Sequence, residues 1–233
     1  MICLLAGWFF LSDAGHVLSG PARWNGWNWA TAAGVAGAGV GLFFLDEPAR
    51  DLVTSGRNDD LLSVADKLDY AGEGLWLSAG LVCLSGAGLA SGNSALADAG
   101  IVGLESWVLA SGLNLGVKYL AGRARPFTGE GAFSYHMFAS DEDHHSFASG
   151  HTVVAFAGLS GFGFRTGNPW ITVSCLALAT GVAWARVYQD AHWTSDVFWG
   201  AALGTAVGYA LASNHRKTEA GLCFEGGRLI YRF

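Results

Sequence analysis

Long stretches without charged side chains recur along this chain, and they limit the folds that it can adopt. Residues 24–45 contain no Asp, Glu, Lys or Arg, and neither do residues 74–97. A helix rises ~1.5 Å per residue, so runs of this length cross a hydrocarbon core ~30 Å thick. Further apolar runs lie at 99–117, 151–164, 166–185 and 197–213. The pattern predicts an all-α fold, a six-helix transmembrane bundle, although the run at 151–164 is short unless its helix begins in a water-filled mouth.

The composition agrees with a membrane protein made of one domain. Hydrophobic residues make up 52% of the 233 residues and charged residues only 14%, which is below the share usual in soluble domains. The net charge of −6 argues against nucleic acid as a partner. Residues 24–45 open with three tryptophans, as expected at the headgroup level, and carry glycines that permit close helix contact, Gly34, Gly37, Gly39 and Gly41. We expect a single domain over residues 1–233.

The polar segments fall on one side of the predicted bundle. Residues 46–73 have apolar positions at helical spacing and predict an amphipathic helix outside the membrane or against the domain. Counting spans along the chain places this segment beside residues 118–150 and 186–196. The opposite side receives a slight excess of basic residues, Arg23, Arg165, Arg216 and Lys217, which predicts the cytoplasmic side. The polar segments should therefore face outward.

The two ends of the chain carry weaker signals. The apolar run at 2–11 has no basic residues before it, so we expect an interfacial helix, with a worn or truncated targeting segment as the alternative. The tail, residues 214–233, predicts a small hairpin around Gly226 and Gly227. The four cysteines are scattered without the spacing of a zinc site or a disulfide framework.

Residues 185–196 place a cation, an imidazole and a carboxylate between two apolar runs. If the chain is helical from Trp193 onward, His192 and Asp196 are i,i+4 neighbours on one face. A carboxylate in that position holds one imidazole nitrogen and leaves the other free to act as a base or nucleophile. Arg186, just upstream, has a fork of donors suited to an oxyanion. Taken alone, the segment fits a helix-end salt bridge equally well.

Two other motifs precede this segment, and the three together are specific. Lys118 is followed by six residues and then by Arg125 and Pro126, and residues 149–151 read Ser-Gly-His before an apolar run. In order and spacing the three resemble the signature of the type-2 phosphatidic acid phosphatase (PAP2) superfamily, KxxxxxxRP, PSGH and SRxxxxxHxxxD. The resemblance covers about residues 98–213. Alanine replaces the family's proline at position 148 and its serine at position 185.

The resemblance implies a role for each matching residue. His192 is the nucleophile that attacks phosphorus, and Asp196 orients it and stabilises its imidazolium. His151 is the acid for the leaving oxygen and then the base for water. The phosphate is bound by the remaining motif residues, Lys118, Arg125, Ser149, Gly150 and Arg186. Because three cations neutralise the phosphate, we expect no metal and no other cofactor.

Several polar residues outside the motifs have simpler interpretations. The run Asp141–His145 is expected to be a solvated acidic loop, because consecutive side chains cannot all converge on one ion, and His136 is a loop histidine with no evident partner. Arg123 is expected to meet lipid headgroups. Glu105 lies within an apolar run, where a carboxylate is costly, so it should face the bundle interior and a hydrogen-bond partner.

These observations together predict an integral membrane enzyme of the membrane lipid phosphatase branch. It would hydrolyse a lipid phosphate or pyrophosphate through a phosphohistidine, in a bacterial inner membrane with the site facing the periplasm. Its partners would be membrane lipids and a phospholipid or polyprenyl (pyro)phosphate substrate. The alternatives are a soluble periplasmic acid phosphatase of the same superfamily and a non-catalytic six-helix membrane protein. A vanadate-dependent haloperoxidase would share the anion site, but it is usually a longer, soluble chain.

Overall fold

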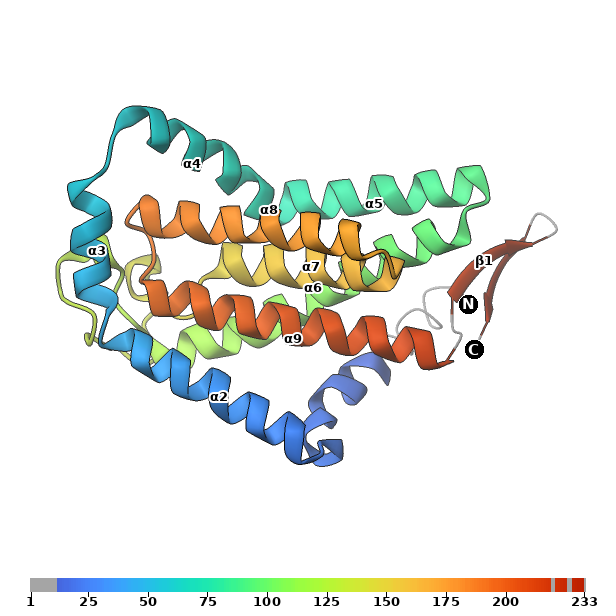
Figure 1. The fold of residues 1–233 in the computed structure, drawn as a ribbon, viewed down its shortest axis with the longest axis horizontal. Helices are drawn as coiled ribbons and strands as arrows, with labels where there is room; N and C mark the ends of the chain where they lie inside the picture. The colour runs from blue at the N-terminus through green and yellow to red at the C-terminus, as the bar shows by residue number, and fades with distance from the viewer. Residues whose placement is uncertain (1–11, 219–220, 226–227, 233) are drawn as a thin grey trace.

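The computed structural model describes residues 12–218, 221–225 and 228–232, and there the chain forms an α-helical bundle followed by one short hairpin (Figure 1). The α-helices are α2 (Gly26–Phe43), α3 (Asp46–Ser55), α4 (Asp59–Gly72), α5 (Gly74–Ser91), α6 (Ser94–Ala121), α7 (Gly150–Thr166), α8 (Pro169–Tyr188) and α9 (Thr194–Thr218). Residues 12–18 are also helical. Strands β1 (Gly221–Glu225) and β2 (Arg228–Arg232) pair antiparallel with Gly221 opposite Arg232, which confirms the hairpin predicted for the tail.

The helices begin and end where the sequence supplies capping groups. Asparagine side chains accept hydrogen bonds from first-turn amides of four helices, at Asn25, Asn58, Asn93 and Asn168. Left-handed glycines follow α5, α6 and α7, at Gly92, Gly122 and Gly167. The connections after α5 and α7 are only two residues long, so α5–α6 and α7–α8 fold back as antiparallel pairs.

Helix α7 occupies the centre of the bundle. It packs against α9, α6, α8, α5 and α4, and its side chains Val153, Leu159 and Phe162 are buried among them. The apolar character of this helix therefore reflects packing against protein. Its 17 residues suffice because it begins at the mouth of the site and is enclosed by longer helices.

Glycines on α9 allow α7 to approach closely. Gly200, Gly204 and Gly208 recur every four residues and so share one face of the helix. A Cβ on Gly204 would lie only 2.7 Å from the carbonyl oxygen of Val153 and 2.8 Å from the amide of Ala157. Only hydrogen at these positions permits this backbone separation.

The glycines predicted to mediate contact on α2 behave differently. A Cβ on Gly34, Gly37 or Gly41 would meet no neighbouring atom within 4 Å among the described residues. Gly39 alone of the four packs closely, against the ring of Trp199 on α9. That expectation was therefore wrong for three of the four positions, since α2 rests on α9 along one narrow line.

The all-α bundle is confirmed, but the predicted count of six spanning helices is not. Within the described residues, three helices are long and apolar enough to cross a membrane, α5, α6 and α8. Helices α2 and α3 add a fourth span if the pair is taken as one element bent by 61°. The count follows helix length and composition, and α7, with 17 residues, is shorter than α5, α6 and α8.

As predicted, the polar segments of the chain lie at one end of the bundle. Segment 46–73 forms two helices, α3 and α4, rather than one, and both pack against α8. They lie at the same end as the loop after α6 and the turn between α8 and α9, at the left of Figure 1. At the other end Glu105 faces inward as predicted, with its Oε2 atom 3.2 Å from Nε2 of the buried His215.

Candidate active site

The three sequence motifs meet at one end of the bundle. Lys118 lies in the last turn of α6, residues 149–151 begin α7, and Arg186 lies in the last turn of α8. Arg125 and His192 come from the loops that follow α6 and α8. The charges of Lys118 and Arg125 act on His192, and the charge of Arg186 acts on Lys118 and Arg125, so these groups share one small volume.

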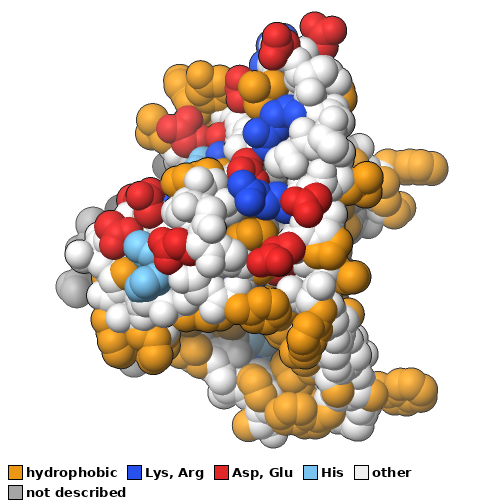
Figure 2. Space-filling view, turned by 90° about the vertical axis from the view of Figure 1, so that its left-hand side faces the viewer, with side chains coloured by type: hydrophobic (Ala, Val, Ile, Leu, Met, Phe, Trp, Pro, Cys, Tyr) orange, Lys and Arg blue, Asp and Glu red, His pale blue; other side chains and the backbone are white. Residues whose placement is uncertain are grey.

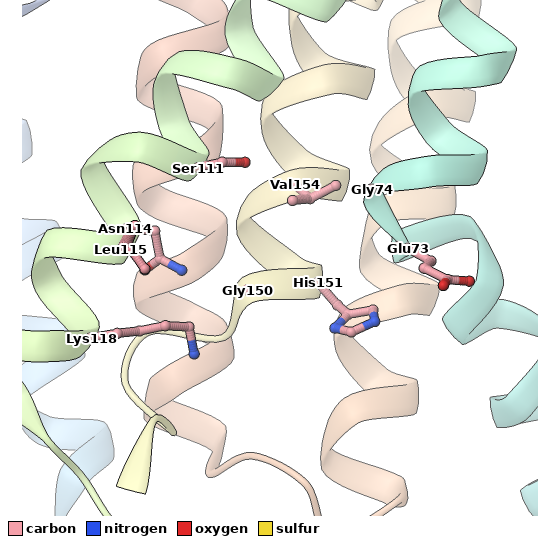
Figure 3. A pocket seen from close by; sticks show the side chains of 10 residues that line it. Glu73, Gly74, Ser111, Asn114, Leu115, Lys118, Gly150, His151 and Val154 are labelled. Atoms are coloured by element: carbon pink, nitrogen blue, oxygen red, sulfur yellow. The ribbon is translucent and has the colours of Figure 1, made fainter. Parts of the chain in front are cut away.

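A pocket opens beside this group of side chains, between the start of α5, α6 and the start of α7 (Figure 3). Its volume is about 310 Å³. Lys118 and His151 project into its mouth, and Leu115 and Val154 line the wall behind them. The pocket thus places a cation and an imidazole next to an apolar surface.

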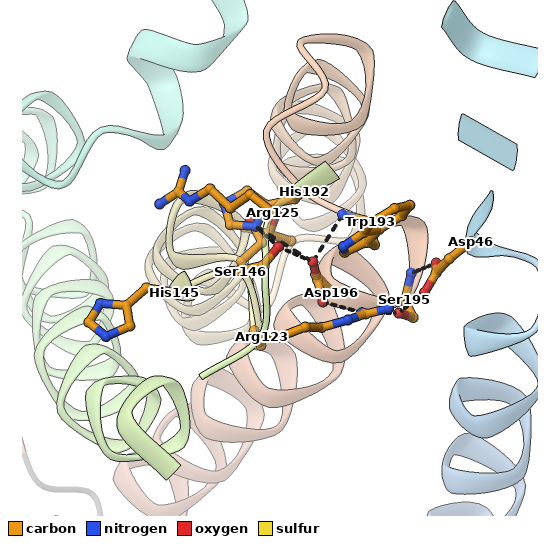
Figure 4. Close-up of polar contacts among 12 residues, drawn as sticks. Asp46, Arg123, Arg125, His145, Ser146, His192, Trp193, Ser195 and Asp196 are labelled. Carbon is orange, nitrogen blue, oxygen red and sulfur yellow. Dashed lines mark hydrogen bonds and ion pairs between the residues drawn. The ribbon is translucent and has the colours of Figure 1, made fainter. Parts of the chain in front are cut away.

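Asp196 lies in the first turn of α9, close to His192 (Figure 4). Its Oδ2 atom accepts the backbone amide of Trp193 at 2.9 Å, the reach of a carboxylate back to the start of its own helix. Nδ1 of His192 lies 3.8 Å from the same oxygen, beyond hydrogen-bonding distance. The predicted pair is therefore brought together, but it is not in direct contact.

Ser146 bridges the gap between the two residues. Its hydroxyl donates to Oδ2 of Asp196 at 2.5 Å and lies 3.4 Å from Nδ1 of His192. A proton on Nδ1 would then point to the serine oxygen and leave Nε2 with its lone pair. No sequence motif marked Ser146, since it lies in the loop that joins α6 to α7.

The ring of His192 is enclosed by protein, and burial is the main influence on its charge. Desolvation lowers the pKa of His192 to about 3, against the opposing effect of Asp196. Lys118 and Arg125 also disfavour a second positive charge nearby. The imidazole is therefore neutral near pH 7, the form required of a nitrogen nucleophile.

Arg123 is fully buried and joins Asp196 to α3, which corrects the expectation that it meets headgroups. Its Nη1 donates to Oδ1 of Asp196 at 2.6 Å, and its Nη2 donates to Oδ2 of Asp46 at 2.7 Å. Nε and Nη2 also donate to the carbonyl of Ala132. One buried cation thus sits between two buried carboxylates, and all three side chains are completely shielded from solvent.

Asp46 also caps the helix that carries Asp196. Its Oδ1 atom accepts the backbone amide of Ser195 at 2.8 Å, and its Oδ2 atom accepts the Ser195 hydroxyl at 2.5 Å. A carboxylate at the first turn of α9 satisfies amides that lack partners within the helix. The sequence offered no pairing signal, because Asp46 and Ser195 are far apart in the chain.

Each predicted phosphate-binding cation is held by a different part of the fold. The Nε atom of Arg125 donates to the carbonyl of Glu142 at 2.8 Å. Nη1 of Arg186 donates to Asp69 of α4 at 2.8 Å, and its Nε is buried without a partner in the described residues. Lys118 donates to the carbonyl of His145. Burial, and then the charge of Arg186, lower the pKa of Arg125, so a bound anion would relieve crowding among the cations.

Asp69 was not identified from the sequence, where it is one acidic residue of an amphipathic helix. Besides Arg186, it approaches His151, with its Oδ1 atom 3.8 Å from Nε2 of the imidazole. The imidazole is about one-third exposed and so is open to the pocket. Asp69 therefore links the predicted acid–base residue to a predicted phosphate ligand.

Ser149 and Gly150 were both predicted to bind phosphate, but their backbone amides lie in different environments. The amide of Ser149 donates to the carbonyl of Asp196 at 3.2 Å, so it faces α9 instead of the pocket. Gly150 begins α7, where an amide has no helical acceptor, and it lines the pocket beside Lys118. Of the two alanines that depart from the family pattern, Ala185 is buried in an apolar cluster with Ala65 and Tyr188.

The run Asp141–His145 does not converge on a point, as predicted. His145 turns away to the carbonyl of Ala139, and Glu142 turns toward Arg125. His144 alone of the run approaches a carboxylate from elsewhere in the loop, that of Glu130, which His136 also contacts. His136 therefore has a partner that the sequence did not reveal.

Comparison with known proteins identifies the family to which the chain belongs. A family model described as the PAP2 superfamily matches residues 100–219, which include every motif residue. The lipid A 1-phosphatase of Porphyromonas gingivalis is 38% identical over 93 residues. That match covers 39% of this chain and 18% of the longer protein.

Two solved structures share the fold. The transmembrane PAP2 type phosphatidylglycerolphosphate phosphatase from Bacillus subtilis superposes with a TM-score of 0.60 and 20% identity, covering 92% of this chain and 96% of the other. LpxE from Aquifex aeolicus has a TM-score of 0.54 and 21% identity, covering 72% of this chain and 95% of the other. At these identities the likeness is one of architecture.

Proposed function

Because the chain belongs to the PAP2 superfamily, we propose that it is an integral membrane phosphatase that removes a terminal phosphate from a lipid phosphate or pyrophosphate. The observation that carries the proposal is the convergence of Lys118, Arg125 and Arg186 with His151 and His192 at one end of the bundle, beside a partly apolar pocket that Lys118 and His151 line. Three fixed cations suit a phosphate dianion, and an apolar wall beside them suits a lipid chain.

The proposed reaction has two steps. Nε2 of His192 attacks phosphorus while the bond from phosphorus to the lipid oxygen breaks. His151, whose proton is stabilised by the negative charge of the bound phosphate, donates that proton to the leaving oxygen. In the second step His151 takes a proton from water, the hydroxyl attacks the phosphohistidine, and inorganic phosphate leaves with neutral His192 restored. The cations stabilise the charge on the equatorial oxygens in both steps.

The bridge through Ser146 supports this assignment of His192. As phosphorus bonds to Nε2 the ring becomes positively charged, and the proton on Nδ1 then interacts more strongly with the Ser146 hydroxyl and Asp196 behind it. Arg123 keeps Asp196 ionised and in place. No metal is needed in this scheme, because side-chain cations carry the charge that magnesium carries in kinases.

The substrate class follows the names of the similar proteins, which are a lipid A 1-phosphatase and a phosphatidylglycerolphosphate phosphatase. We place the enzyme in a bacterial inner membrane with the site toward the periplasm. The ends of α7 and α9, which carry Arg165 and Arg216, lie at the end of the bundle opposite to the site (Figure 1). Arg165 there is ion-paired with Asp98, so the bias is carried by few charges.

The decisive experiment is phosphate release by the purified protein in detergent. The panel contains phosphatidic acid, phosphatidylglycerophosphate, undecaprenyl pyrophosphate and a lipid A phosphate, with a soluble aryl phosphate for comparison. We expect release from at least one lipid at a higher kcat/KM than from the aryl ester, and none from His192→Ala. A preference for soluble esters, with release of the protein from membranes by carbonate, would favour the soluble acid phosphatase. No hydrolysis at all would favour the non-catalytic membrane protein.

A further inference from the structure

Two histidines and a glutamate gather on the loop between α6 and α7, outside the proposed active site. The ligand atoms of Glu130, His136 and His144 all lie within 4.8 Å of one another. Nε2 of His136 is 2.8 Å from one oxygen of Glu130, and Nε2 of His144 is 3.1 Å from the other. The two imidazole rings are 4.0 Å apart between centroids.

A second carboxylate orients one of these histidines. Oδ1 of Asp141 lies 2.6 Å from Nδ1 of His144, and it also accepts the backbone amide of the same residue. Nδ1 therefore donates to Asp141, and Nε2 donates to Glu130, so a metal ion would replace the proton on Nε2. Metal-bound histidines commonly have this arrangement, with a carboxylate on the nitrogen that does not face the ion.

We propose that Glu130, His136 and His144 bind a zinc ion through a carboxylate oxygen and two Nε2 atoms, with water as the fourth ligand. Imidazole and carboxylate are ligands that Zn²⁺ accepts readily, whereas Mg²⁺ and Ca²⁺ prefer oxygen alone. Ligands ~2.0–2.1 Å from a tetrahedral zinc ion lie ~3.3 Å from each other. His136 and His144 contact different oxygens of Glu130, at 2.8 and 3.1 Å, and the three ligand atoms lie within 4.8 Å of one another, so the side chains would draw together by up to ~1.5 Å around the ion.

The cluster is accessible to an ion from solvent. The side chains of His136 and Glu130 are 49% and 37% exposed, and His144 is 19% exposed. Figure 2 shows histidine side chains beside acidic ones on the surface of this end of the molecule. Hydrogen bonds alone also satisfy Glu130, so the experiment must separate a metal site from a hydrogen-bonded cluster.

Zinc at this position would fix the loop that holds Arg125. The amide of Arg125 donates to the carbonyl of Asp143 at 2.9 Å, and its Nε donates to the carbonyl of Glu142. These carbonyls belong to the two residues before His144. Tying residues 130, 136 and 144 to one ion would therefore restrain the peptide groups that position the guanidinium. The ion would not touch the substrate.

The test begins with full-length protein in detergent, stripped of metal by a chelator that is then removed. Zinc binding is measured by competition with a chromophoric chelator, and Co²⁺ is added separately to record its absorption spectrum. We expect one zinc ion per chain, a tetrahedral cobalt spectrum, and a higher Tm with zinc. Absence of stoichiometric binding, or an octahedral cobalt spectrum, would overturn the proposal.

Variants then locate the ion. His136→Ala and His144→Ala should each weaken zinc binding by at least ~100-fold, and Asp141→Asn by ~10–100-fold as an orienting residue. Asp143→Asn is the matched control, because it removes a charge from the same loop without touching the cluster, and it should bind zinc like the wild type. If the His136→Ala, His144→Ala double variant still bound one ion, or the control lost it equally, the site would not be this one.

Discussion

At the scale of single residues, the proposed chemistry depends on the different environments of two histidines. His192 is buried against Ser146 and Asp196, where it is neutral and immobile. His151 is partly exposed at the mouth of the pocket, next to Asp69 and near the three cations. A nucleophile benefits from fixed geometry and an acid–base group from contact with water. The two positions predict different responses to mutation.

His192→Ala should abolish turnover of every substrate, since it removes the atom that bonds to phosphorus. His151→Ala should lose phosphoenzyme formation with a phosphatidate by ~10²–10⁴-fold but retain it with an activated aryl phosphate, whose leaving group departs without a proton. Labelled phosphohistidine should accumulate in this variant, because the base for water is missing. Rapid-quench labelling with both substrates measures the contrast. Equal loss with both substrates, or label on His192→Ala, would contradict the assigned roles.

The low pKa of His192 also predicts a dependence of stability on pH. The folded pKa of about 3 lies below the unfolded value of ~6.5, so between these values only the unfolded chain takes up a proton. The contribution of neutral His192 is therefore complete above about pH 6.5 and is lost as the pH falls toward 3. Between pH 7 and pH 5 the loss is ~2 kcal/mol. The Tm of the wild type should fall more steeply between pH 7 and pH 5 than the Tm of His192→Gln. If the two Tm values fell in parallel, the depressed pKa of His192 would be refuted.

Arg123→Lys should lower kcat by roughly tenfold to a hundredfold with little change in KM. Lysine keeps the charge but cannot contact Asp46 and Asp196 together with the Ala132 carbonyl, and each charged hydrogen bond is worth ~1.5–3 kcal/mol. Because Arg123 acts on Asp196 and not on the substrate, the kcat effect should exceed the KM effect for every lipid tested. A rise in KM alone would assign Arg123 to substrate binding.

At the scale of elements, the site depends on how closely α7 and α9 approach. The residue before α7, Ser149, and the first turn of α9 are linked through the Ser149 amide and the Asp196 carbonyl. The same face of α9 continues with the glycines at positions 200, 204 and 208. A change in the distance between α7 and α9 would therefore also change the geometry of the site.

Gly204→Ala should lower the free energy of unfolding by ~1–3 kcal/mol, because its Cβ would collide with the backbone of α7. Activity should fall with it, as the start of α7 moves from α9. Gly80→Ala in α5 is the control, since a Cβ there meets nothing within 4 Å in the described residues, and alanine favours a helix. Thermal unfolding in one detergent compares the two variants. A Tm for Gly204→Ala equal to that of the control would show that α7 and α9 tolerate a wider separation.

At the scale of the whole molecule, the two ends of the bundle differ. One end, the chemical end, holds the candidate active site, and the other, the structural end, holds a group of buried ion pairs. The structural end buries His215 with the carboxylates of Asp13, Asp98 and Glu105, and Arg165 pairs with Asp98. These ion pairs fasten the segment that contains Asp13 to α6 and α9. At the chemical end Lys118, Arg125 and Arg186 lie close enough for their charges to act on one another, so a bound phosphate would relieve their repulsion.

Turnover should persist in excess EDTA, because Lys118, Arg125 and Arg186 supply the positive charge that the reaction needs. Removing an ion from the loop between α6 and α7 should lower the Tm and change kcat/KM only modestly. Phosphate release and thermal unfolding are measured on the same EDTA-treated sample. Loss of turnover that magnesium or zinc restores would show that a metal takes part in the chemistry.

The sequence by itself determined the helical class, the shared end of the bundle and the residues of three motifs. Apolar runs reflect local length and composition, and the three motifs are recognised by their order and spacing, so both can be read along the chain. The sequence also predicted that Glu105 faces the interior and that the tail forms a hairpin. A carboxylate within an apolar run and a Gly-Gly turn are both local signals.

Only the tertiary structure decided the roles of Arg123, Asp46, Asp69 and Ser146. Each acts through a partner distant in sequence, as Arg123 does across 73 positions to Asp196 and Asp69 across 117 to Arg186. A charged residue looks the same in sequence whether it meets lipid headgroups or lies between two buried carboxylates. The number of long apolar helices also depended on helix bounds that the structure supplied: α7 has 17 residues and is shorter than α5, α6 and α8.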